Sequence, residues 1–344
     1  MQLEDGSFCH EVVRGAPAPR GRSLRYTAIV LLGLLRAEAR GRDHPFDTAR
    51  LKSRLIDTVG APEVTPGDIG LLLWADARSG TEATDRLLDA LRASVRRTGL
   101  DGLEGMEVAW IATGLAETHL RLKRPEVDPL LAAMVAQLLD RRSSPSGLLL
   151  HRGSGSRRRF PNFATQIYGV IALVRIAGIL EDPRAADAAR RIGDRLLELQ
   201  RSNGGWPWIF DARRGTVVEP FEVYSVHQDA MAPMGLFDLS ESTGDPRYRE
   251  AALRGLDWIW ENELGRPMLD PGAGMLYRSI RRRRPLDRGV LYANTLGSYL
   301  GRAPLARWNG PLEVNPTDRP YHLGWVLEAW SGREAVPTSS SSSA

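Results

Sequence analysis

Three segments of the chain are apolar on nearly every side, and they alternate with segments that are apolar on one side only. The apolar segments are LRYTAIVLLGLL from Leu24, MEVAWIATGLA from Met106 and FATQIYGVIALVRIA from Phe163. A helix that is apolar all round must be buried all round. TEATDRLLDALRASVRR and DPRAADAARRIGDRLLELQ instead carry one apolar stripe and one charged face. The alternation predicts an inner layer and an outer layer of helices.

Helical periodicity extends over most of the chain, and strand patterns are scarce. Gly, Pro and Ser-Gly punctuation separates the periodic segments. The pattern predicts helices at 23–39, 45–59, 66–78, 81–98, 104–121, 126–141, 162–179, 182–201, 225–242, 246–263, 289–302 and 320–331. The low-complexity residues 333–344, which end in PTSSSSSA, are expected to be a disordered tail.

A weak internal repeat links these helices. An amphipathic helix leads into a turn with glycine and aromatic or aliphatic residues, then a loop, then a buried helix that begins with aromatic residues. The unit occurs at GSFCHEVV…SLRYTAI, SGLLLHRG…FPNFATQIYGV, GGWPWIFD…EVYSVHQDAM and GAGMLYRSI…GVLYANTLG. Repeated helical units form closed or stacked arrays. We predict an all-α fold over residues 1–332, a single (α/α)6 toroid of about twelve helices with short β-hairpins at one end. An open solenoid is the alternative, and the irregular repeat lengths favour closure.

Composition limits the partners. The chain carries 46 lysine and arginine residues against 42 aspartate and glutamate residues, a net charge of +4. Such an excess can indicate a polyanionic partner. Nearly all of the positive charge is arginine, however, which a GC-rich genome also tends to encode. No basic strand with interleaved aromatic residues is present, so we expect no nucleic-acid partner.

Several classes of site have no matching pattern. The single cysteine, Cys9, excludes an intramolecular disulfide and a cysteine-rich zinc site. No P-loop, HExxH or EF-hand pattern occurs, and we expect neither a metal nor a cofactor. The N-terminal residues lack the regions of a secretory signal, and the longest apolar run, AIVLLGLL, is shorter than the ~20 residues of a membrane span. We therefore expect a cytoplasmic protein without a membrane span.

In a toroid of this kind the inner helices begin at one end, so polar residues in their first turns surround one mouth. His227 and Asp229 open the helix that continues AMAPMGLF, where apolar residues are expected. Pro233 inside this helix should kink it. Helix capping by Ser225, Gln228 and Asp229 is the alternative interpretation. We predict that His227 and Asp229 are catalytic.

Neighbouring residues extend this candidate site. Several titratable or aromatic side chains flank the same turn, and acid–base chemistry needs such groups to converge. We predict Tyr224 and Asp211 as further catalytic residues. Substrate contacts are predicted for Trp206, Trp208, Gln228 and Glu222.

Two arginine clusters precede buried helices. One is Arg157 to Arg159 in HRGSGSRRRFPNF, and the other includes Arg278 and Arg281 in MLYRSIRRRRPLDRG. Guanidinium groups bind carboxylate and phosphate in bidentate fashion. We predict that Arg159, Arg278 and Arg281 hold an anionic small molecule or oligosaccharide. A solvated surface run is the alternative.

Two resemblances bear on the class of protein. Gln200-x-x-x-Gly204-Gly205-Trp206 resembles the QW-type motif of the prenyltransferase and squalene-cyclase toroids, where its role is structural. LQRSNGGWPW followed by HQDAM is similar to the pattern of family-10-type pectate lyases. STGDPRYREAALRGLDWIWEN resembles (α/α)6 sugar enzymes such as uronyl epimerases and unsaturated glucuronyl hydrolases. The calcium ligands of the lyases have no match here except Asp229.

Three alternative functions are consistent with these patterns and resemblances. The first is a lyase, epimerase or hydrolase that acts on an acidic, uronate-type sugar. In the lyase or epimerase, His227 or Tyr224 would remove a proton beside the carboxylate and an arginine would neutralise the developing charge. In the hydrolase, Asp211 and Asp229 would be the acid–base pair. The second is a terpene cyclase-like enzyme that binds an isoprenoid diphosphate, and the third is a non-catalytic saccharide-binding toroid.

Overall fold

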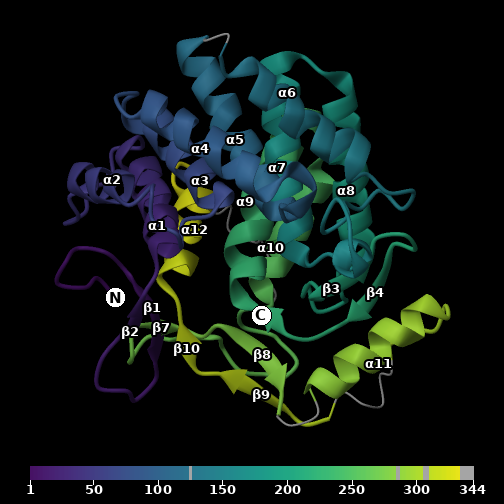
Figure 1. Ribbon diagram of the computed structural model, residues 1–344. Helices are drawn as coiled ribbons and strands as arrows, with labels where there is room; N and C mark the ends of the chain where they lie inside the picture. Colours follow the sequence, from purple (N-terminus) through teal and green to yellow (C-terminus); the bar gives the residue numbers. More distant parts are fainter. Residues whose placement is uncertain (124–125, 284–286, 305–309, 334–344) are drawn as a thin grey trace.

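The computed structural model describes residues 1–123, 126–283, 287–304 and 310–333. Six of the described helices form an inner ring (Figure 1): α1 (Leu24–Glu38), α3 (Pro66–Ser79), α5 (Gly105–Leu122), α7 (Phe163–Leu180), α9 (Ala232–Thr243) and α12 (Pro320–Trp330). Each lies against the next in this order, and α12 lies against α1. The ring is therefore closed. The predicted (α/α)6 toroid is confirmed, and the solenoid alternative is wrong.

Five of the helices within the described ranges pack outside this ring. They are α2 (Thr48–Asp57), α4 (Thr84–Thr98), α6 (Asp128–Ala136), α8 (Pro183–Leu199) and α10 (Pro246–Asp257). In α4, Leu87, Leu88 and Leu91 are buried on one side while the arginines face outward. Burial of one stripe is what the amphipathic sequence of these helices predicts.

Aromatic rings fill the centre of the inner ring. Tyr168 on α7 lies 5.7 Å from Trp325 on α12 and 5.1 Å from Trp110 on α5, measured between ring centroids. Since α7 and α12 are not neighbours in the ring, the Tyr168–Trp325 contact crosses its axis. By length and composition α7 would suit a membrane span, alone among the described helices, and most of it is buried in the inner ring.

The helix predicted at 289–302 is present as α11 (Asp287–Tyr299), but it is not part of either ring. It lies at the strand-bearing end, against β4 (Thr216–Glu219), as Figure 1 shows. Its described buried residues follow one narrow stripe, Val290, Asn294 and Ser298, and two of the three are polar. Asn294 and Ser298 donate to the carboxylates of Glu219 and Asp211. A stripe this polar cannot fill an inner position, so the expectation of a buried fourth repeat helix is wrong.

The strands form four small sheets at the same end. They are β1 (Cys9–Val13) between β2 (Arg20–Arg22) and β10 (Thr317–Asp318), the hairpin of β3 (Ile209–Asp211) with β4, β8 (Ser279–Arg282) between β5 (Val223–Tyr224) and β9 (Leu312–Asn315), and β6 (Leu269–Asp270) with β7 (Met275–Leu276). All the pairs are antiparallel. The strands precede inner helices, so the inner helices begin at this end, which we call the mouth.

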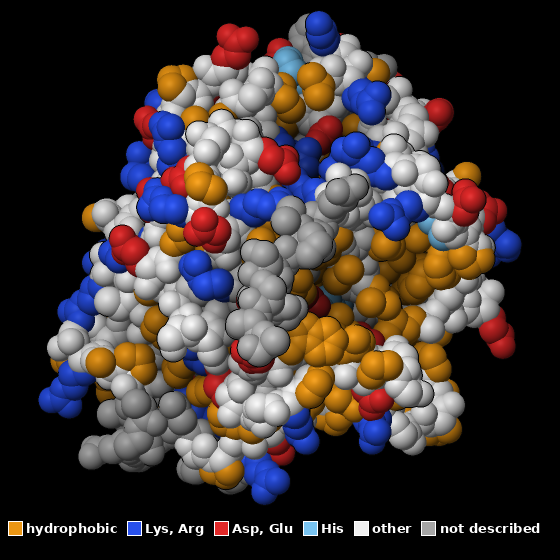
Figure 2. Space-filling view, turned by 180° about the vertical axis from the view of Figure 1, so that it is seen from behind, with side chains coloured by type: hydrophobic (Ala, Val, Ile, Leu, Met, Phe, Trp, Pro, Cys, Tyr) orange, Lys and Arg blue, Asp and Glu red, His pale blue; other side chains and the backbone are white. Residues whose placement is uncertain are grey.

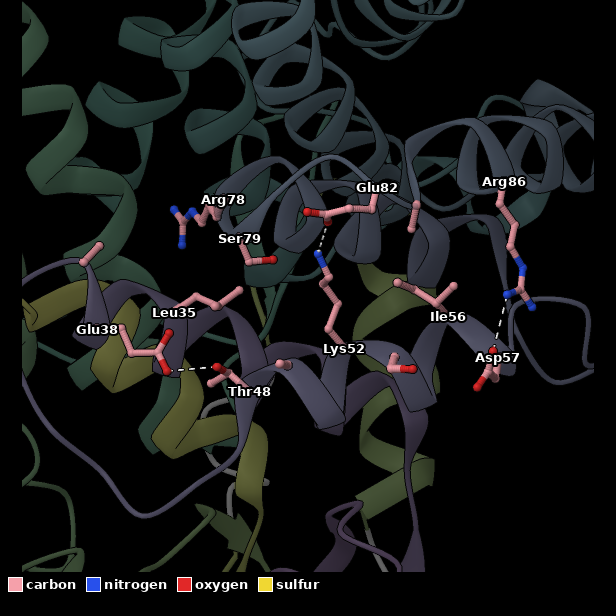
Figure 3. Close-up of a pocket in the computed structure, with 14 residues that line it drawn as sticks. Leu35, Glu38, Thr48, Lys52, Ile56, Asp57, Arg78, Ser79, Glu82 and Arg86 are labelled. Atoms are coloured by element: carbon pink, nitrogen blue, oxygen red, sulfur yellow. Dashed lines mark hydrogen bonds and ion pairs between the residues drawn. The ribbon is translucent and has the colours of Figure 1, made fainter.

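Ion pairs close the opposite end. Arg78 at the end of α3 donates to Glu328 of α12 at 2.8 Å, Arg175 of α7 to Glu117 of α5, and Arg333 to Asp238 of α9. Arginine at a helix C-terminus is also favoured by the helix dipole. A hollow of about 870 Å³ lies on this side between α1, α2, α3 and α4 (Figure 3). Four of its charged side chains pair with each other, Lys52 with Glu82 and Arg86 with Asp57.

Candidate active site

The chain enters α9 through a five-residue π-helical turn, His227–Met231 (η4). Pro233 explains the irregularity, because it has no N–H to donate to the carbonyl of Asp229 four residues earlier. That carbonyl instead accepts from the indole Nε1 of Trp330 at 2.6 Å. Single π-helical turns are frequent at functional sites. Here the turn places two titratable side chains at the mouth of the inner ring.

Asp229 is paired with a histidine from the neighbouring inner helix. Oδ1 of Asp229 lies 2.6 Å from Nε2 of His322, in the first turn of α12, and both side chains are buried. With the Nε2 proton directed at the carboxylate, Nδ1 of the imidazole is left to exchange a proton. A carboxylate that orients a histidine in this way is a recurring device of acid–base sites.

His227 lies in an aromatic box. Its ring is 4.8 Å from that of Phe163 and 5.0 Å from that of Tyr224. Burial, together with the positive charges of His322 and Arg278, lowers the pKa of His227 to about 3. Its Nδ1 has no hydrogen-bond partner within the described parts of the chain. His227 is therefore a neutral imidazole with an unused nitrogen, which is the state that a general base requires.

A guanidinium and the phenol of Tyr224 lie beside this histidine, and the partly buried phenol of Tyr321 lies close to both. Arg278 sits over the ring of Tyr224 at 5.2 Å, and no ion pair or hydrogen bond to its guanidinium is found among the residues the structure describes. Burial, and then the charge of Glu222, raise the pKa of Tyr224, while burial raises that of Tyr321 to about 12. The two phenols stay protonated and can donate hydrogen bonds, and Arg278 supplies a positive charge that an anion can neutralise.

The mouth is lined by aromatic rings. Trp208, partly exposed, meets the Tyr224 ring edge-on at 5.9 Å, and Tyr26 of α1 packs against Tyr321 at 4.5 Å. Beside Tyr26 a hollow of about 510 Å³ opens, lined in part by Arg25, which pairs with Asp68. Figure 2, a view from behind, shows hydrophobic side chains gathered around a hollow in the lower half, the strand-bearing end.

Six of the residues predicted from sequence come together here. They are His227, Asp229, Tyr224, Trp208, Glu222 and Arg278. They come from η4, from β5 with the residue that precedes it, from the segment before β3, and from the residue that precedes β8. All of these segments surround the start of α9.

Two predicted residues pair with each other instead. Asp211 is fully buried and accepts from Arg159, from the Ser298 hydroxyl at 2.6 Å and from the backbone N–H of Arg213 at 3.0 Å. Burial would raise the pKa of Asp211, but the hydrogen bonds from Arg159 and Ser298 bring it below its ordinary value. Asp211 is thus an anion that holds the β3–β4 hairpin, and the catalytic role predicted for it is not supported by its contacts.

Three further predicted residues have structural roles. Trp206 is fully buried, and its Nε1 donates to the carbonyl of Leu196 at 3.1 Å. Gln228 accepts from the Trp206 N–H and donates to the carbonyl of Tyr224, so it links the glycine turn to β5. Arg281 pairs with Glu313 across β8 and β9 at 3.0 Å. Because the Trp206 ring is fully buried, a sugar cannot stack on it.

The QW-like motif joins two outer helices. The Gln200 amide donates to the carbonyls of Gly204 and Ala251, on α10, at 2.8 and 2.9 Å. Gly204 has a positive φ of 86°, and a Cβ there would lie 1.9 Å from the carbonyl oxygen of Arg254. The structural role implied by the resemblance is confirmed by these contacts.

Three residues of the mouth were not predicted: His322, Tyr321 and Tyr26. Each lies in the first turn of an inner helix, the position at which His227 and Asp229 were recognised. The segment PYHLGW carries the same signal as YSVHQD, with a tyrosine and a histidine opening an apolar helix. The internal repeat does not extend to that segment, and this is why His322 was not paired with His227.

No protein-family model matches the sequence, and no curated protein is similar to it in sequence. Solved structures do share its fold. A sugar epimerase from a ruminal bacterium is 12% identical, with a TM-score of 0.66 over 97% of this chain and 94% of that chain. An unsaturated glucuronyl hydrolase specific for heparin is 14% identical, with a TM-score of 0.62 over 96% and 91%. A D-mannose isomerase is 11% identical, with a TM-score of 0.64 over 95% and 90%.

The architecture is an (α/α)6 toroid, which this chain shares with these solved carbohydrate enzymes. The isoprenoid alternative receives no support from these comparisons. Among the described residues, no group of three or more His, Cys, Asp or Glu side chains is placed to hold a metal ion.

Proposed function

We propose that this protein is a carbohydrate enzyme that moves a proton at a carbon next to a carbonyl or carboxylate group, as an epimerase, isomerase or lyase does. The observation that carries the proposal is a pair of histidines on adjacent inner helices. His227 is neutral with a free nitrogen, and His322 is oriented by Asp229. Proton transfer needs two such groups, one to take the proton and one to return it.

The chemistry follows from the positions. His227 takes the proton as the C–H bond breaks, and the electron pair moves onto the carbonyl or carboxylate oxygen. Arg278 lies next to His227 and neutralises the negative charge that develops there. In an epimerase or isomerase, a protonated His322 returns a proton to the same or the adjacent carbon. In a lyase, the pair instead forms a carbon–carbon double bond while the leaving group departs with the electrons of its own C–O bond, and His322 protonates that group.

The hydrolase alternative is less well supported. Glycoside hydrolysis generally uses two carboxyl groups, about 5 to 9.5 Å apart, that are available to the substrate. The two carboxylates predicted for this role have other partners: Asp211 is held by Arg159 and Ser298, and Asp229 is paired with His322. Proton transfer to and from the substrate by His227 and His322 requires no change in these contacts.

A saccharide fits the surroundings of the two histidines. Trp208 and Tyr26 offer partly exposed aromatic rings, and the phenols of Tyr224 and Tyr321 can donate hydrogen bonds to sugar hydroxyls. The enzymes that share the fold act on sugars by their names, and two of the three are an epimerase and an isomerase. This supports a saccharide substrate over an isoprenoid.

Exchange of carbon-bound hydrogen with solvent tests the proposal. The protein is incubated in heavy water with glucose, mannose, cellobiose and a glucuronate-containing disaccharide, and deuterium incorporation is followed by NMR. We expect incorporation beside the carbonyl or carboxylate carbon of at least one sugar. His227→Gln and His322→Gln should each slow it by about 100-fold or more. His119→Gln is the matched control, because His119 lies at the far end of α5 and pairs with Asp128. A lyase would instead release an unsaturated product in the same spectra. Hydrolysis of a glycosidic bond with neither incorporation nor an unsaturated product contradicts the proposal, and so does turnover that survives both variants.

A further inference from the structure

A second hollow lies beside the mouth, between the loop before α7, the β3–β4 hairpin and the end of α11. Its volume is about 930 Å³. The lining residues are small, hydroxylated or cationic: Ser143, Ser144, Pro145, Leu150, Gly153, Ser154, Gly155, Arg158, Arg159, Arg213 and Tyr299. The proposed function does not use this hollow.

The charge of the lining is positive. Among the described residues, the lining contains three arginines and no aspartate or glutamate. Arg159 is neutralised by Asp211, whereas no ion pair to Arg158 or Arg213 is found in the described parts of the chain. Nε of Arg158 is buried without a hydrogen-bond partner, and Arg213 is exposed. Nη2 of Arg158 donates to the carbonyl of Arg141 at 3.3 Å, which leaves its positive charge in place. Neither Arg158 nor Arg213 is thus neutralised by a carboxylate among the described residues, which favours an anionic ligand.

The rest of the lining suits a sugar. The ring of Tyr299 is 49% exposed, and its covered side carries the Arg159 guanidinium at 4.7 Å and the edge of Phe160 at 5.3 Å. An aromatic ring fixed in this way presents an apolar face of the kind on which a sugar ring packs. Serine hydroxyls and backbone around Gly153 and Gly155 offer hydrogen-bonding groups to the hydroxyls of the same ligand.

A short segment held by backbone hydrogen bonds joins this hollow to the surroundings of His227. Arg159 at one end lines the hollow, and Phe163 at the other end contacts the ring of His227. Backbone hydrogen bonds from Ala212 to Arg159 and from Phe163 to Trp208 hold the segment beside β3. Four residue steps of extended chain span at most about 14 Å. The two ends of the segment are therefore no farther apart than the length of an oligosaccharide.

We propose that this hollow is a second saccharide subsite that binds an anionic group, so that the substrate is an acidic oligosaccharide with its reacting unit at His227. The inference rests on the proposed function for the reacting end. The carboxylate of a uronate, a sulfate ester and a phosphate ester share the required chemistry.

Calorimetric titration tests the subsite. The probes are a uronate-containing tetrasaccharide and a neutral glucose tetrasaccharide of the same length. The uronate probe should bind about tenfold or more tightly, as charge-assisted hydrogen bonds predict. Arg158→Ala and Arg213→Ala should each remove most of this preference and leave the neutral probe unchanged. Arg158→Lys keeps the charge and should lose less of the preference for the uronate probe than Arg158→Ala. Arg96→Ala, an exposed arginine on α4, is the control for general charge effects.

The outcomes separate the two proposals. Equal affinity for the two probes, or a loss that Arg96→Ala reproduces, overturns the subsite. His227→Gln should retain the uronate preference, so a failure of the proton-exchange test with preserved, arginine-dependent binding contradicts the proposed function alone. Glucuronic acid methyl glycoside, glucose 6-sulfate and glucose 6-phosphate, used as competitors, distinguish the three anionic groups.

Discussion

Nε2 of His322 lies 2.6 Å from Oδ1 of Asp229, across the seam between α12 and the π-helical turn that begins α9. Residues 93 positions apart in the chain are thereby joined at the mouth of the toroid. The carboxylate determines which imidazole nitrogen carries the proton, and this fixes the role that His322 can have in proton transfer.

Asp229→Asn should therefore reduce catalysis without unfolding the protein. The amide can donate to Nε2 and so stabilise the wrong tautomer, and we expect a 10²- to 10⁴-fold slower proton exchange, about the contribution of one acid–base group. Exchange measured by NMR, beside a thermal unfolding curve, checks this. Asp211→Asn is the control: it should lower the melting temperature and leave the exchange rate within about threefold. A similar loss of exchange in both variants would show that the Asp229 pair has only a structural role.

The buried neutral state of His227 should make stability depend on pH. Its pKa is about 3 in the folded protein, against about 6.5 in an unfolded chain, so the unfolded state binds the proton first as the pH falls. The stabilisation is complete above about pH 7 and is lost between about pH 6.5 and 3. At pH 4 the loss is on the order of 3 kcal/mol.

Urea unfolding at several pH values measures this effect. His227→Phe, which fills the box formed by Phe163 and Tyr224, should lose less free energy of unfolding than the wild type between pH 7 and 4. Parallel curves for the two proteins would mean that His227 is not held neutral by its surroundings.

Arg278→Ala should weaken substrate binding selectively. Its guanidinium has no ionic partner among the described residues and lies near His227, so its loss removes charge-assisted hydrogen bonds to the substrate worth about 1.5 to 3 kcal/mol. KM for a carboxylate-bearing sugar should rise about tenfold or more. Arg281→Ala, three residues along and paired with Glu313, should leave KM unchanged. Equal effects of the two substitutions would contradict a role for Arg278 in binding.

Gly204→Ala should destabilise the fold strongly. The alanine Cβ would lie 1.9 Å from the Arg254 carbonyl oxygen, and the residue would also keep a left-handed φ of 86°. We expect a loss of about 3 kcal/mol or more in the free energy of unfolding, from overpacking added to the backbone term. Gly244→Ala isolates the backbone term, because its φ is 72° with nothing within 4 Å of the added Cβ, and it should cost about 1 to 2 kcal/mol. A urea denaturation series compares the two.

The layers of the fold were predictable because burial leaves a periodic pattern in a helix. Segments such as FATQIYGVIALVRIA can only be inner helices, and their boundaries were predicted to within a few residues. The place of α11 was not predictable. Its sequence has helical periodicity, but the face that is buried is the one that donates hydrogen bonds to Asp211 and Glu219 of the β3–β4 hairpin. The sequence of the helix alone does not indicate these contacts.

The candidate site was predicted in part for a related reason. The clustering of His227, Tyr224 and Trp208 follows from the short distance between them in the sequence. His322 lies near the other end of the chain, and its contact with Asp229 depends on closure of the inner ring. Conversely, Asp211 and Trp206 were assigned to the mouth because of neighbours in sequence, but their side chains point into the hairpin and the core.

Closure of the ring by α12 against α1 ties folding to activity. A nascent chain can form the first five inner helices and present His227 while its proton-transfer partner is still missing. Contacts between the two ends of a chain form slowly, because closing a longer loop costs more conformational entropy. The same step that seals the apolar interior brings His322 to Asp229. A partly folded or C-terminally shortened molecule is therefore expected to lack catalytic activity. The time at which turnover begins during refolding would then report when the inner ring closes.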